Sequence, residues 1–480
     1  MGKLFREKNK YTDADYENDE MLEEEPEDDN DSEDDSEDDE DEWDEDERRA
    51  YRKRRRIRNQ VIAYSVVLVI MAAIITGGVF VGSNISSLIK EKRLAEEQAR
   101  MQEQLQAEQE AEAAHDIVID APEAIVEEEP VIDSMGLLVD SYISVMPLEE
   151  KVAGLFIVTP EALTGVNTAT QAGSGTQEAL NEYAVGGLVY FGKNIVSEEQ
   201  IKSMLSNTAS QSGYPIFLAV DEEGGTVSRV ARSNIDVPQV GDMAAIGESQ
   251  DATQAYEAGL TIGTYLKDLG FNVDFAPVAD VSGAGGSAMG DRVFGSDAQL
   301  VADMVTNVVT GIEETGVSSC LKHFPGIGYL EGDTHGGRVE ATKTLDEMRN
   351  SDFIPFQAGI EAGADFVMVS HVTVADADEI AVPSTLSKTI MTDVLRNELG
   401  FEGIIVTDAL NMSAITEYYT TEEASVQAIL AGADMLLMPE DFHAAYNAVL
   451  AAVQDGTISE ERIDESLERI YRVKYAGKVD

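Results

Sequence analysis

One stretch of the sequence combines the residue types that acid–base chemistry needs. An apolar run, Val317 to Leu321, leads into Lys322 and His323, and a glycine-rich loop then leads to Asp333 and His335. Asp333 and His335 are two residues apart, close enough for the carboxylate to orient the imidazole and raise its basicity. The stretch therefore predicts an acid–base pair after a buried strand. The plainer interpretation is a polar strand-end loop with a hydrogen-bonded histidine.

Composition argues against several classes of protein. The 480 residues carry 92 Asp and Glu against 34 Lys and Arg, a formal net charge of −58. A protein this acidic is a poor candidate for binding nucleic acid, whose phosphates it would repel. Cys320 is the one cysteine, so no intrachain disulfide can form. Its apolar surroundings indicate a small core residue rather than a nucleophile.

The acidic charge is concentrated near the N-terminus. Residues 1–47 contain few apolar side chains and are expected to be disordered. A basic cluster between Arg48 and Arg58 follows, and residues 1–58 together are expected to form a cytoplasmic tail. Residues 61–81 are apolar and uncharged, about the ~20 residues that cross a bilayer, so 59–82 are expected to form a transmembrane signal anchor. Because basic residues precede it, we expect a single-pass protein of the cell membrane with the N-terminus cytoplasmic and the rest extracytoplasmic.

The segment after this apolar run predicts a spacer. Residues 88–113 are rich in Glu, Gln, Ala, Lys and Leu, a composition that favours helix. Residues 114–133 add two prolines and an acidic run, so 83–133 are expected to be a helical stalk and linker. The folded domain is then expected to occupy 134–480, which ends too soon to hold a second α/β domain.

The rest of the chain alternates short apolar runs with longer amphipathic stretches. The runs that predict strands are Leu155–Val158, Gly187–Phe191, Ile216–Val220, Val273–Pro277, Val317–Leu321, Phe366–Ser370, Ile404–Thr407 and Met435–Met438. Helical patterns occur at Ala252–Leu269, Ala298–Glu314, Leu345–Ala362, Lys388–Glu398 and Ser459–Tyr475. Strands that are apolar on both faces and alternate with helices indicate a parallel sheet. Eight of them favour an α/β fold with a single (β/α)₈ TIM-like barrel, and an open doubly wound sheet is the alternative.

Polar residues follow five successive strands of this predicted barrel. They are Asp221, Asp280, Lys322 with His323, His371 and Asp408. Active residues of such barrels gather at the carboxyl ends of the strands, so we expect these side chains to share one site.

Several of these motifs resemble the family 3 glycoside hydrolases of the β-N-acetylglucosaminidase type. Lys322-His323-Phe324-Pro325-Gly326 with Asp333-Thr334-His335 is similar to the family's KHFPGHG…D-[ST]-H signature, with Ile327 in place of its second histidine. The turn from Asp221 through Arg229, the Asp291-Arg292-Val293-Phe294-Gly295 segment and Thr407-Asp408 are similar to three further motifs of the family.

The resemblance implies roles for individual residues. His335 would be the general acid/base, Asp333 would hold it, and Asp408 would be the nucleophile. The resemblance and the strand-end pattern together place six residues against the sugar. They are Asp221, Arg229, Arg292, Lys322, His323 and His371. Simpler roles remain open, because Asp408 could cap a helix, the two arginines could form ion pairs and His371 could be a packed strand-end residue. Glu222 and Glu223 could be either structural or functional.

The implied reaction is hydrolysis with retention, in which terminal β-linked N-acetylglucosamine is removed from peptidoglycan or chitin-type fragments. No metal or cofactor is expected, and the first predicted strand lacks the His-x-His of a metal-dependent hydrolase. The expected partners are the oligosaccharide or muropeptide substrate and the membrane, through one helix. A β-glycosidase or N-acetylglucosaminide phosphorylase of the same family, and an inactive anchored sugar-binding protein, are the alternatives.

Overall fold

The computed structural model describes residues 133–283, 289–330 and 337–476. The chain divides into two units, residues 1–127 and 128–480, and all the described residues belong to the second. The expected tail, anchor and stalk lie outside the described residues. Within the described part, no helix combines the length and the apolar character that crossing a membrane requires.

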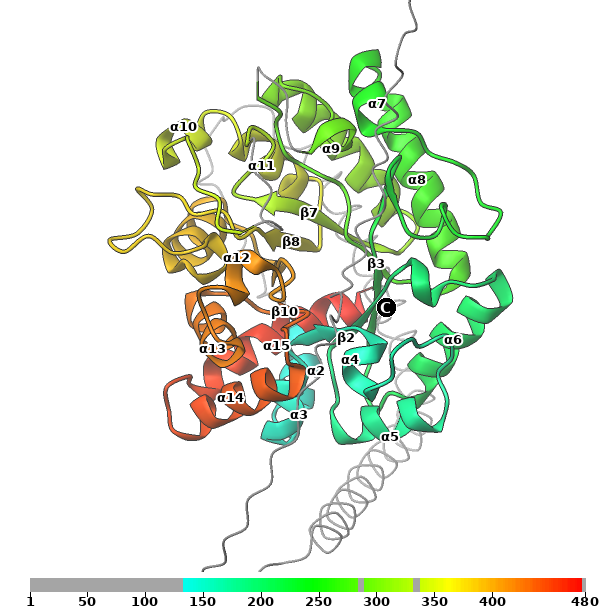
Figure 1. Ribbon diagram of the computed structural model, residues 1–480, viewed down its shortest axis with the longest axis vertical. Coiled ribbons are helices and arrows are strands. Elements are labelled where there is room, and N and C mark those ends of the chain that lie inside the picture. The colour runs from blue at the N-terminus through cyan, green and yellow to red at the C-terminus, as the bar shows by residue number, and fades with distance from the viewer. Residues whose placement is uncertain (1–132, 284–288, 331–336, 477–480) are drawn as a thin grey trace, which may run out of the picture. The chain divides into compact units, whose positions relative to one another are not determined.

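Eight parallel strands form a closed barrel (Figure 1). They are β1 (Phe156–Val158), β2 (Gly187–Tyr190), β3 (Phe217–Val220), β6 (Val273–Asp274), β7 (Ser318–Phe324), β8 (Phe366–Val369), β9 (Ile404–Thr407) and β10 (Leu436–Leu437). Their order is β10-β1-β2-β3-β6-β7-β8-β9. A parallel bridge between Val406 and Met435 joins β9 to the start of β10 and closes the ring. The predicted TIM-like barrel is thus confirmed, and the open sheet is excluded.

Helices surround the barrel (Figure 1). Their bounds are α2 (Ser134–Ile143), α3 (Leu148–Ala153), α4 (Pro160–Thr164), α5 (Ser174–Glu182), α6 (Glu198–Gln211), α7 (Met243–Ser249), α8 (Ala252–Leu269), α9 (Ala298–Glu313), α10 (Leu345–Arg349), α11 (Phe353–Glu361), α12 (Ser413–Thr416), α13 (Thr421–Ala431), α14 (Phe442–Gln454) and α15 (Glu460–Tyr475). Short 3₁₀ turns occupy η1 (Gly192–Asn194), η2 (Gly290–Arg292) and η4 (Ser384–Leu386). A small hairpin, β4 (Glu222–Gly224) with β5 (Val227–Ser228), follows β3.

Two predicted helices differ from the observed ones. The pattern at 345–362 is broken into α10 and α11, because Asp352 turns into the interior and pairs with Lys343 at 2.5 Å. Pro355, in the first turn of α11, lacks the N–H that a continuous helix would use there. The helix predicted at 388–398 is present at Thr389–Glu398 (η5), but it is a π-helix.

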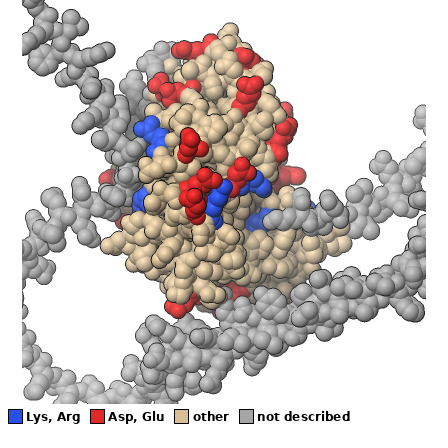
Figure 2. All heavy atoms as spheres, turned by 90° about the vertical axis from the view of Figure 1, so that its right-hand side faces the viewer, with Lys and Arg blue, Asp and Glu red and all other residues tan. Residues whose placement is uncertain are grey.

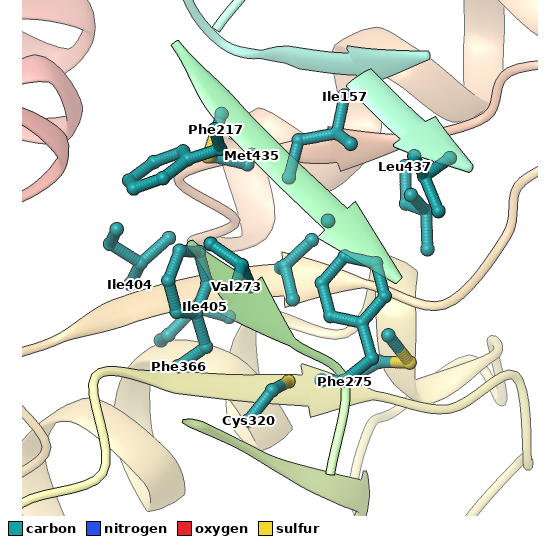
Figure 3. Close-up of a cluster of buried hydrophobic side chains, with 14 of the residues drawn as sticks. Ile157, Phe217, Val273, Phe275, Cys320, Phe366, Ile404, Ile405, Met435 and Leu437 are labelled. Carbon is teal, nitrogen blue, oxygen red and sulfur yellow. The ribbon is translucent and has the colours of Figure 1, made fainter. Parts of the chain in front are cut away.

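Apolar side chains fill the interior of the barrel (Figure 3). The rings of Phe217 and Phe366 meet edge to face across this interior, with centroids 5.1 Å apart. Cys320 is fully buried among them, and burial raises the pKa of its thiol. The cysteine is therefore a core residue, as its surroundings in the sequence predicted.

The end of the barrel where β7 and β8 begin carries two carboxylates. Oε1 of Glu313 accepts hydrogen bonds from the N–H and the hydroxyl of Ser319, both at 2.7 Å. Oδ2 of Asp365 accepts one from the Ser318 hydroxyl at 2.6 Å. Burial and then the charge of Asp365 raise the pKa of Glu313 to about 8. These groups join the ends of neighbouring elements and lie away from the predicted site.

Candidate active site

Lys322 is the most deeply buried cation at the opposite end of the barrel. Its Nζ lies 2.7 Å from Oδ1 of Asp221, just past β3, and 2.6 Å from Oε1 of Glu223 in β4. Burial alone would lower the pKa of Lys322, but the negative charges of Asp221 and Glu223 outweigh it and raise that pKa. The ammonium group is therefore charged at every physiological pH.

Glu223 also binds Arg292, from η2, through two parallel hydrogen bonds. Nε donates to Oε2 and Nη2 donates to Oε1, both at 2.7 Å. Burial would raise the pKa of Glu223, but Arg292 and Lys322 outweigh it and hold that pKa well below its usual range. Glu223 thus remains ionised with its side chain only 1% exposed. Sequence reasoning left this residue undecided, and its place beside Asp221 was the available signal.

Glu222, the preceding residue, has a different role. Its carboxylate accepts hydrogen bonds from the backbone N–H groups of Val230 and Ala231, at 2.7 and 2.9 Å, and from the Tyr265 hydroxyl at 2.7 Å. Burial raises its pKa. It therefore fixes the hairpin after β3 and the position of Arg229.

Arg229 lies half-buried beside this hairpin. Its N–H donates to the carbonyl of Asp221 at 3.2 Å, and its guanidinium carbon lies 5.6 Å from the centre of the Phe191 ring. Nε has no hydrogen-bond partner among the residues that the structure describes. Arg229 thus joins the ends of β2 and β3, and a sugar contact for it remains a prediction.

His323 follows Lys322 and is held by Asp280. Nδ1 of His323 lies 2.8 Å from Oδ2 of Asp280, while Oδ1 accepts the N–H of Ile327 at 2.7 Å. A carboxylate oxygen accepts, so the proton of the neutral ring is on Nδ1 and Nε2 is an acceptor. Gly328 then passes so close to Val281 that a Cβ would lie 2.6 Å from its carbonyl oxygen. Asp280 and this glycine set the path of the loop after β7.

Asp408 lies half-buried at the carboxyl end of β9. Its N–H donates to the carbonyl of Val369 at 2.8 Å, and its Oδ1 accepts the N–H of Ala409 at 2.7 Å. The next helix, α12, begins at Ser413, and its N-cap residue, Met412, makes no side-chain hydrogen bond to it. Asp408 therefore lies at the barrel end that carries Lys322, and its role as nucleophile stays a prediction.

His371 is buried directly behind this segment. Its Nδ1 lies 2.8 Å from Oγ1 of Thr385, and its Nε2 lies 2.8 Å from the carbonyl oxygen of Ala409. The ring thus braces the backbone next to Asp408, in the manner of a packed strand-end histidine. The expectation that it binds substrate stays a prediction.

The predicted acid–base pair, Asp333 and His335, lies outside the described residues, in 331–336. The described chain approaches it through Ile327, whose side chain packs on Val278, Met289 and Val293. In the ranges given above, no three His, Cys, Asp or Glu side chains are grouped as a metal ion would require.

Charge on the surface is arranged differently from charge in the site. Figure 2 shows one face, on which acidic side chains are spread widely and basic ones lie mostly beside them. The described residues on this face form no continuous basic surface for a nucleic acid. The site pairs its cations with carboxylates, which suits a neutral ligand rich in hydroxyl groups.

Comparison with known proteins points to one family. The model of the glycosyl hydrolase family 3 N-terminal domain matches residues 147–473. A β-hexosaminidase of Stenotrophomonas maltophilia K279a is 35% identical over 294 residues, which cover 60% of this chain and 86% of that protein. β-Hexosaminidase A of Pseudoalteromonas piscicida is 32% identical over 325 residues, and the match covers 62% of this chain but only 54% of the relative.

Solved structures agree. A family 3 β-N-acetylglucosaminidase from Paenibacillus sp. FPU-7 superposes with a TM-score of 0.64 at 34% identity, over 70% of this chain and 64% of that one. The β-glucoside phosphorylase BglX gives the same TM-score at 23% identity, over 73% and 63% of the two chains. At that identity the second likeness shows the fold alone.

Proposed function

Since this chain belongs to glycosyl hydrolase family 3 and is of its β-N-acetylhexosaminidase type, we propose that it removes terminal β-linked N-acetylglucosamine with retention of configuration. The observation that carries this proposal is the placing of Asp408 at the barrel end that also holds the paired charges of Asp221, Glu223, Arg292 and Lys322. A nucleophilic carboxylate beside donors for sugar hydroxyls is what a retaining glycosidase needs.

In the first step, a carboxylate oxygen of Asp408 attacks the anomeric carbon. The bond from that carbon to the leaving oxygen breaks, and the oxygen keeps the electron pair and takes a proton from His335. In the second step water attacks the same carbon and gives a proton to His335, and the electron pair of the bond to Asp408 returns to the carboxylate. The roles of His335 and of Asp333, its orienting partner, are inferred from the sequence motif.

The charged cluster would bind the sugar in the same proposal. Lys322 has three N–H donors and uses two on Asp221 and Glu223, and among the described residues the third is left for a hydroxyl. His323 has Nε2 left for a sugar hydroxyl, because its Nδ1 is paired with Asp280. Hydrogen bonds to charged groups are roughly twice as strong as neutral ones, so such contacts hold the ring firmly.

The first test is release of 4-nitrophenol from the 4-nitrophenyl β-glycosides of N-acetylglucosamine and of glucose by the full-length chain. Turnover of the N-acetylglucosaminide is expected, with a loss of at least about 10³-fold in Asp408→Ala and in His335→Ala. Thermal unfolding of each variant serves as the control for folding. If the folded wild-type protein turns over neither sugar, the hydrolase proposal is wrong and an inactive sugar-binding protein takes its place.

A second version of the assay, with phosphate added, distinguishes hydrolysis from phosphorolysis. The same assay is run with phosphate, and the products are identified by mass spectrometry. Free N-acetylglucosamine is expected with and without phosphate. Accumulation of N-acetylglucosamine 1-phosphate, at a rate that rises with phosphate concentration, would make the protein a phosphorylase.

We also propose that residues 59–82 anchor the chain and that the barrel lies outside the cell membrane. The support is the uncharged apolar run preceded by basic residues. Fragments of peptidoglycan that end in N-acetylglucosamine are then the natural substrate. Protease added to intact spheroplasts should remove the barrel, and protection of the barrel until lysis would contradict this orientation.

A further inference from the structure

Glu223 is bound to two cations that come from different parts of the barrel. Arg292 lies in the loop that follows β6, and Lys322 lies near the end of β7. Nη2 of Arg292 and Nζ of Lys322 lie 2.7 and 2.6 Å from the same oxygen, Oε1 of Glu223. One carboxylate, with 1% of its side chain exposed, therefore fixes two long and flexible side chains against each other.

The hydrogen bonds to Glu223 decide which donors of the two cations are left. Arg292 uses Nε and Nη2 on the carboxylate, and its Nη1 has a contact with the sulfur of Met289 at 3.7 Å. Lys322 uses one N–H on Glu223 and one on Asp221. Arg292 thus turns Nη1 away from the carboxylate, and Lys322 keeps one N–H that no described residue accepts.

We propose that Glu223 is a positioning residue of the glycosidase: it binds Arg292 and Lys322 together and thereby directs their remaining N–H donors to the sugar. This inference rests on the function proposed above. Glu223 is too deeply buried to touch the substrate, and it would act through the positions of the two cations. A misplacement of about 1 Å in such contacts can lower the rate by about 10²-fold.

Glu222 offers a matched comparison because it is adjacent, carries the same carboxylate and is equally buried. Its hydrogen-bond partners are two backbone N–H groups and a tyrosine hydroxyl, and the cation whose charge acts on it is Arg229 rather than Arg292 or Lys322. Loss of its charge should therefore weaken the hairpin after β3. Loss of the charge of Glu223 should instead change the positions of Arg292 and Lys322 and lower the pKa of Lys322.

The charge of Lys322 provides a readout that a purely structural role would not change. The charged and titratable groups around Lys322 are Asp221, Glu223, Arg292, Asp274 and Cys320. Burial raises the pKa of Asp274 and of Cys320, so neither provides a firm negative charge. Without Glu223, Lys322 would keep Asp221 as its anion and would still face Arg292, and it would lose its proton at a lower pH.

The test measures kcat and KM of the full-length chain from pH 5 to 10 on 4-nitrophenyl N-acetyl-β-glucosaminide, for wild type, Glu223→Gln and Glu222→Gln. Glu223→Gln should lower kcat/KM by about 10²-fold at pH 7. Because its Lys322 loses a proton at a lower pH, kcat/KM of Glu223→Gln should also fall more steeply than that of the wild type above the alkaline limb that His335 sets. Glu222→Gln should lower the unfolding temperature and leave the alkaline limb in place.

Glu223→Asp, which keeps the negative charge, is the control for effects of misfolding in Glu223→Gln. Glu223→Asp should retain the alkaline limb and lower kcat/KM, because the shorter side chain cannot reach both cations. Wild-type values of kcat/KM in Glu223→Asp, or a folded Glu223→Gln with the wild-type profile and rate, would overturn the inference. Inactivity of the wild type would instead overturn the proposed function.

Discussion

Nδ1 of His323 lies 2.8 Å from Oδ2 of Asp280, and the other oxygen of that carboxylate accepts the N–H of Ile327 at 2.7 Å. Asp280 is fully buried in the segment that follows β6, two residues after Val278, which bridges to Lys322. One side chain therefore orients a histidine of the proposed sugar site and also fixes the start of the loop that leads toward His335. This arrangement makes Asp280 a useful point to perturb.

Replacing Asp280 with asparagine should lower kcat/KM by about 10- to 100-fold. The carboxylate accepts from the N–H and Nδ1 of His323 on one oxygen and from the N–H of Ile327 on the other. An amide has an oxygen on one side only, so an N–H donor on the other side is left unsatisfied, which costs about 1–3 kcal/mol. Steady-state kinetics on the N-acetylglucosaminide checks this. Asp303→Asn, on the exposed side of α9, is the control, and equal activity of both variants would contradict the argument.

Replacing Gly247 with alanine should impair the site from a distance. A Cβ on this residue of α7 would lie 1.7 Å from the carbonyl oxygen of Phe294, two residues after Arg292. The clash must displace that segment, so we expect a loss of about 1–3 kcal/mol in stability together with a lower kcat/KM. Thermal unfolding and kinetics measure the two effects.

Gly175 is the control for this substitution, because it is helical and nothing lies within 4 Å of a Cβ placed there. Gly175→Ala should keep full activity and gain slightly in stability. Wild-type kinetics in Gly247→Ala would show that Arg292 does not depend on the contact with α7.

The stability of the barrel should fall with rising pH because of Glu313. Its pKa is raised to about 8 in the folded state, so the protonated form favours folding. This contribution is complete below the ordinary carboxyl range and is lost as the pH rises toward about 8. Glu313→Gln cannot ionise, so its unfolding temperature should exceed that of the wild type by about 2–5 °C at pH 8.5.

The advantage of Glu313→Gln should shrink when both proteins are melted near pH 4.5. Glu314 is an exposed neighbour whose carboxylate accepts a hydrogen bond from the Tyr256 hydroxyl and not from Ser318 or Ser319. Glu314→Gln should therefore show no such dependence of the unfolding temperature on pH. A constant difference between Glu313→Gln and wild type across the range would mean that Glu313 titrates normally.

The proposed reaction also predicts a stereochemical outcome. Two displacements at the anomeric carbon, the first by Asp408, give the β-anomer of N-acetylglucosamine as the initial product. Proton NMR of the anomeric region during the first minutes of turnover distinguishes it from the α-anomer. An α-anomer formed first would remove Asp408 from the role of nucleophile.

The barrel could be predicted from the sequence because its strands are buried on both faces. Continuous apolar runs mark such strands, and all eight lie within a few residues of their predicted positions. The break between α10 and α11 was missed although Pro355 marks it in the sequence, and its place also depends on the pairing of Asp352 with Lys343 in the folded chain. The π-helical form of η5 likewise leaves no mark in an amphipathic pattern.

The candidate site was predicted less completely. Asp221, Arg292, Lys322 and His323 are brought together as expected. Glu222 and Glu223 are adjacent in the sequence, and only their partners, which come from distant segments, show that one stabilises a hairpin and the other binds the cations. Asp280 was noted near a strand end, but its contact with His323 depends on the bridge between Val278 and Lys322, which joins the segment after β6 to β7.

The ionic cluster around Lys322 also ties activity to complete synthesis of the chain. Asp221 and Lys322 are 101 residues apart, and Glu223 and Arg292 are 69 apart. On the ribosome, Glu223 must therefore wait for its second cation until residue 322 has emerged, and Asp408 follows later still. A polypeptide severed between α9 and β7 could hydrolyse substrate only after its two pieces had reassembled, so turnover would report directly on reconstitution of the whole barrel.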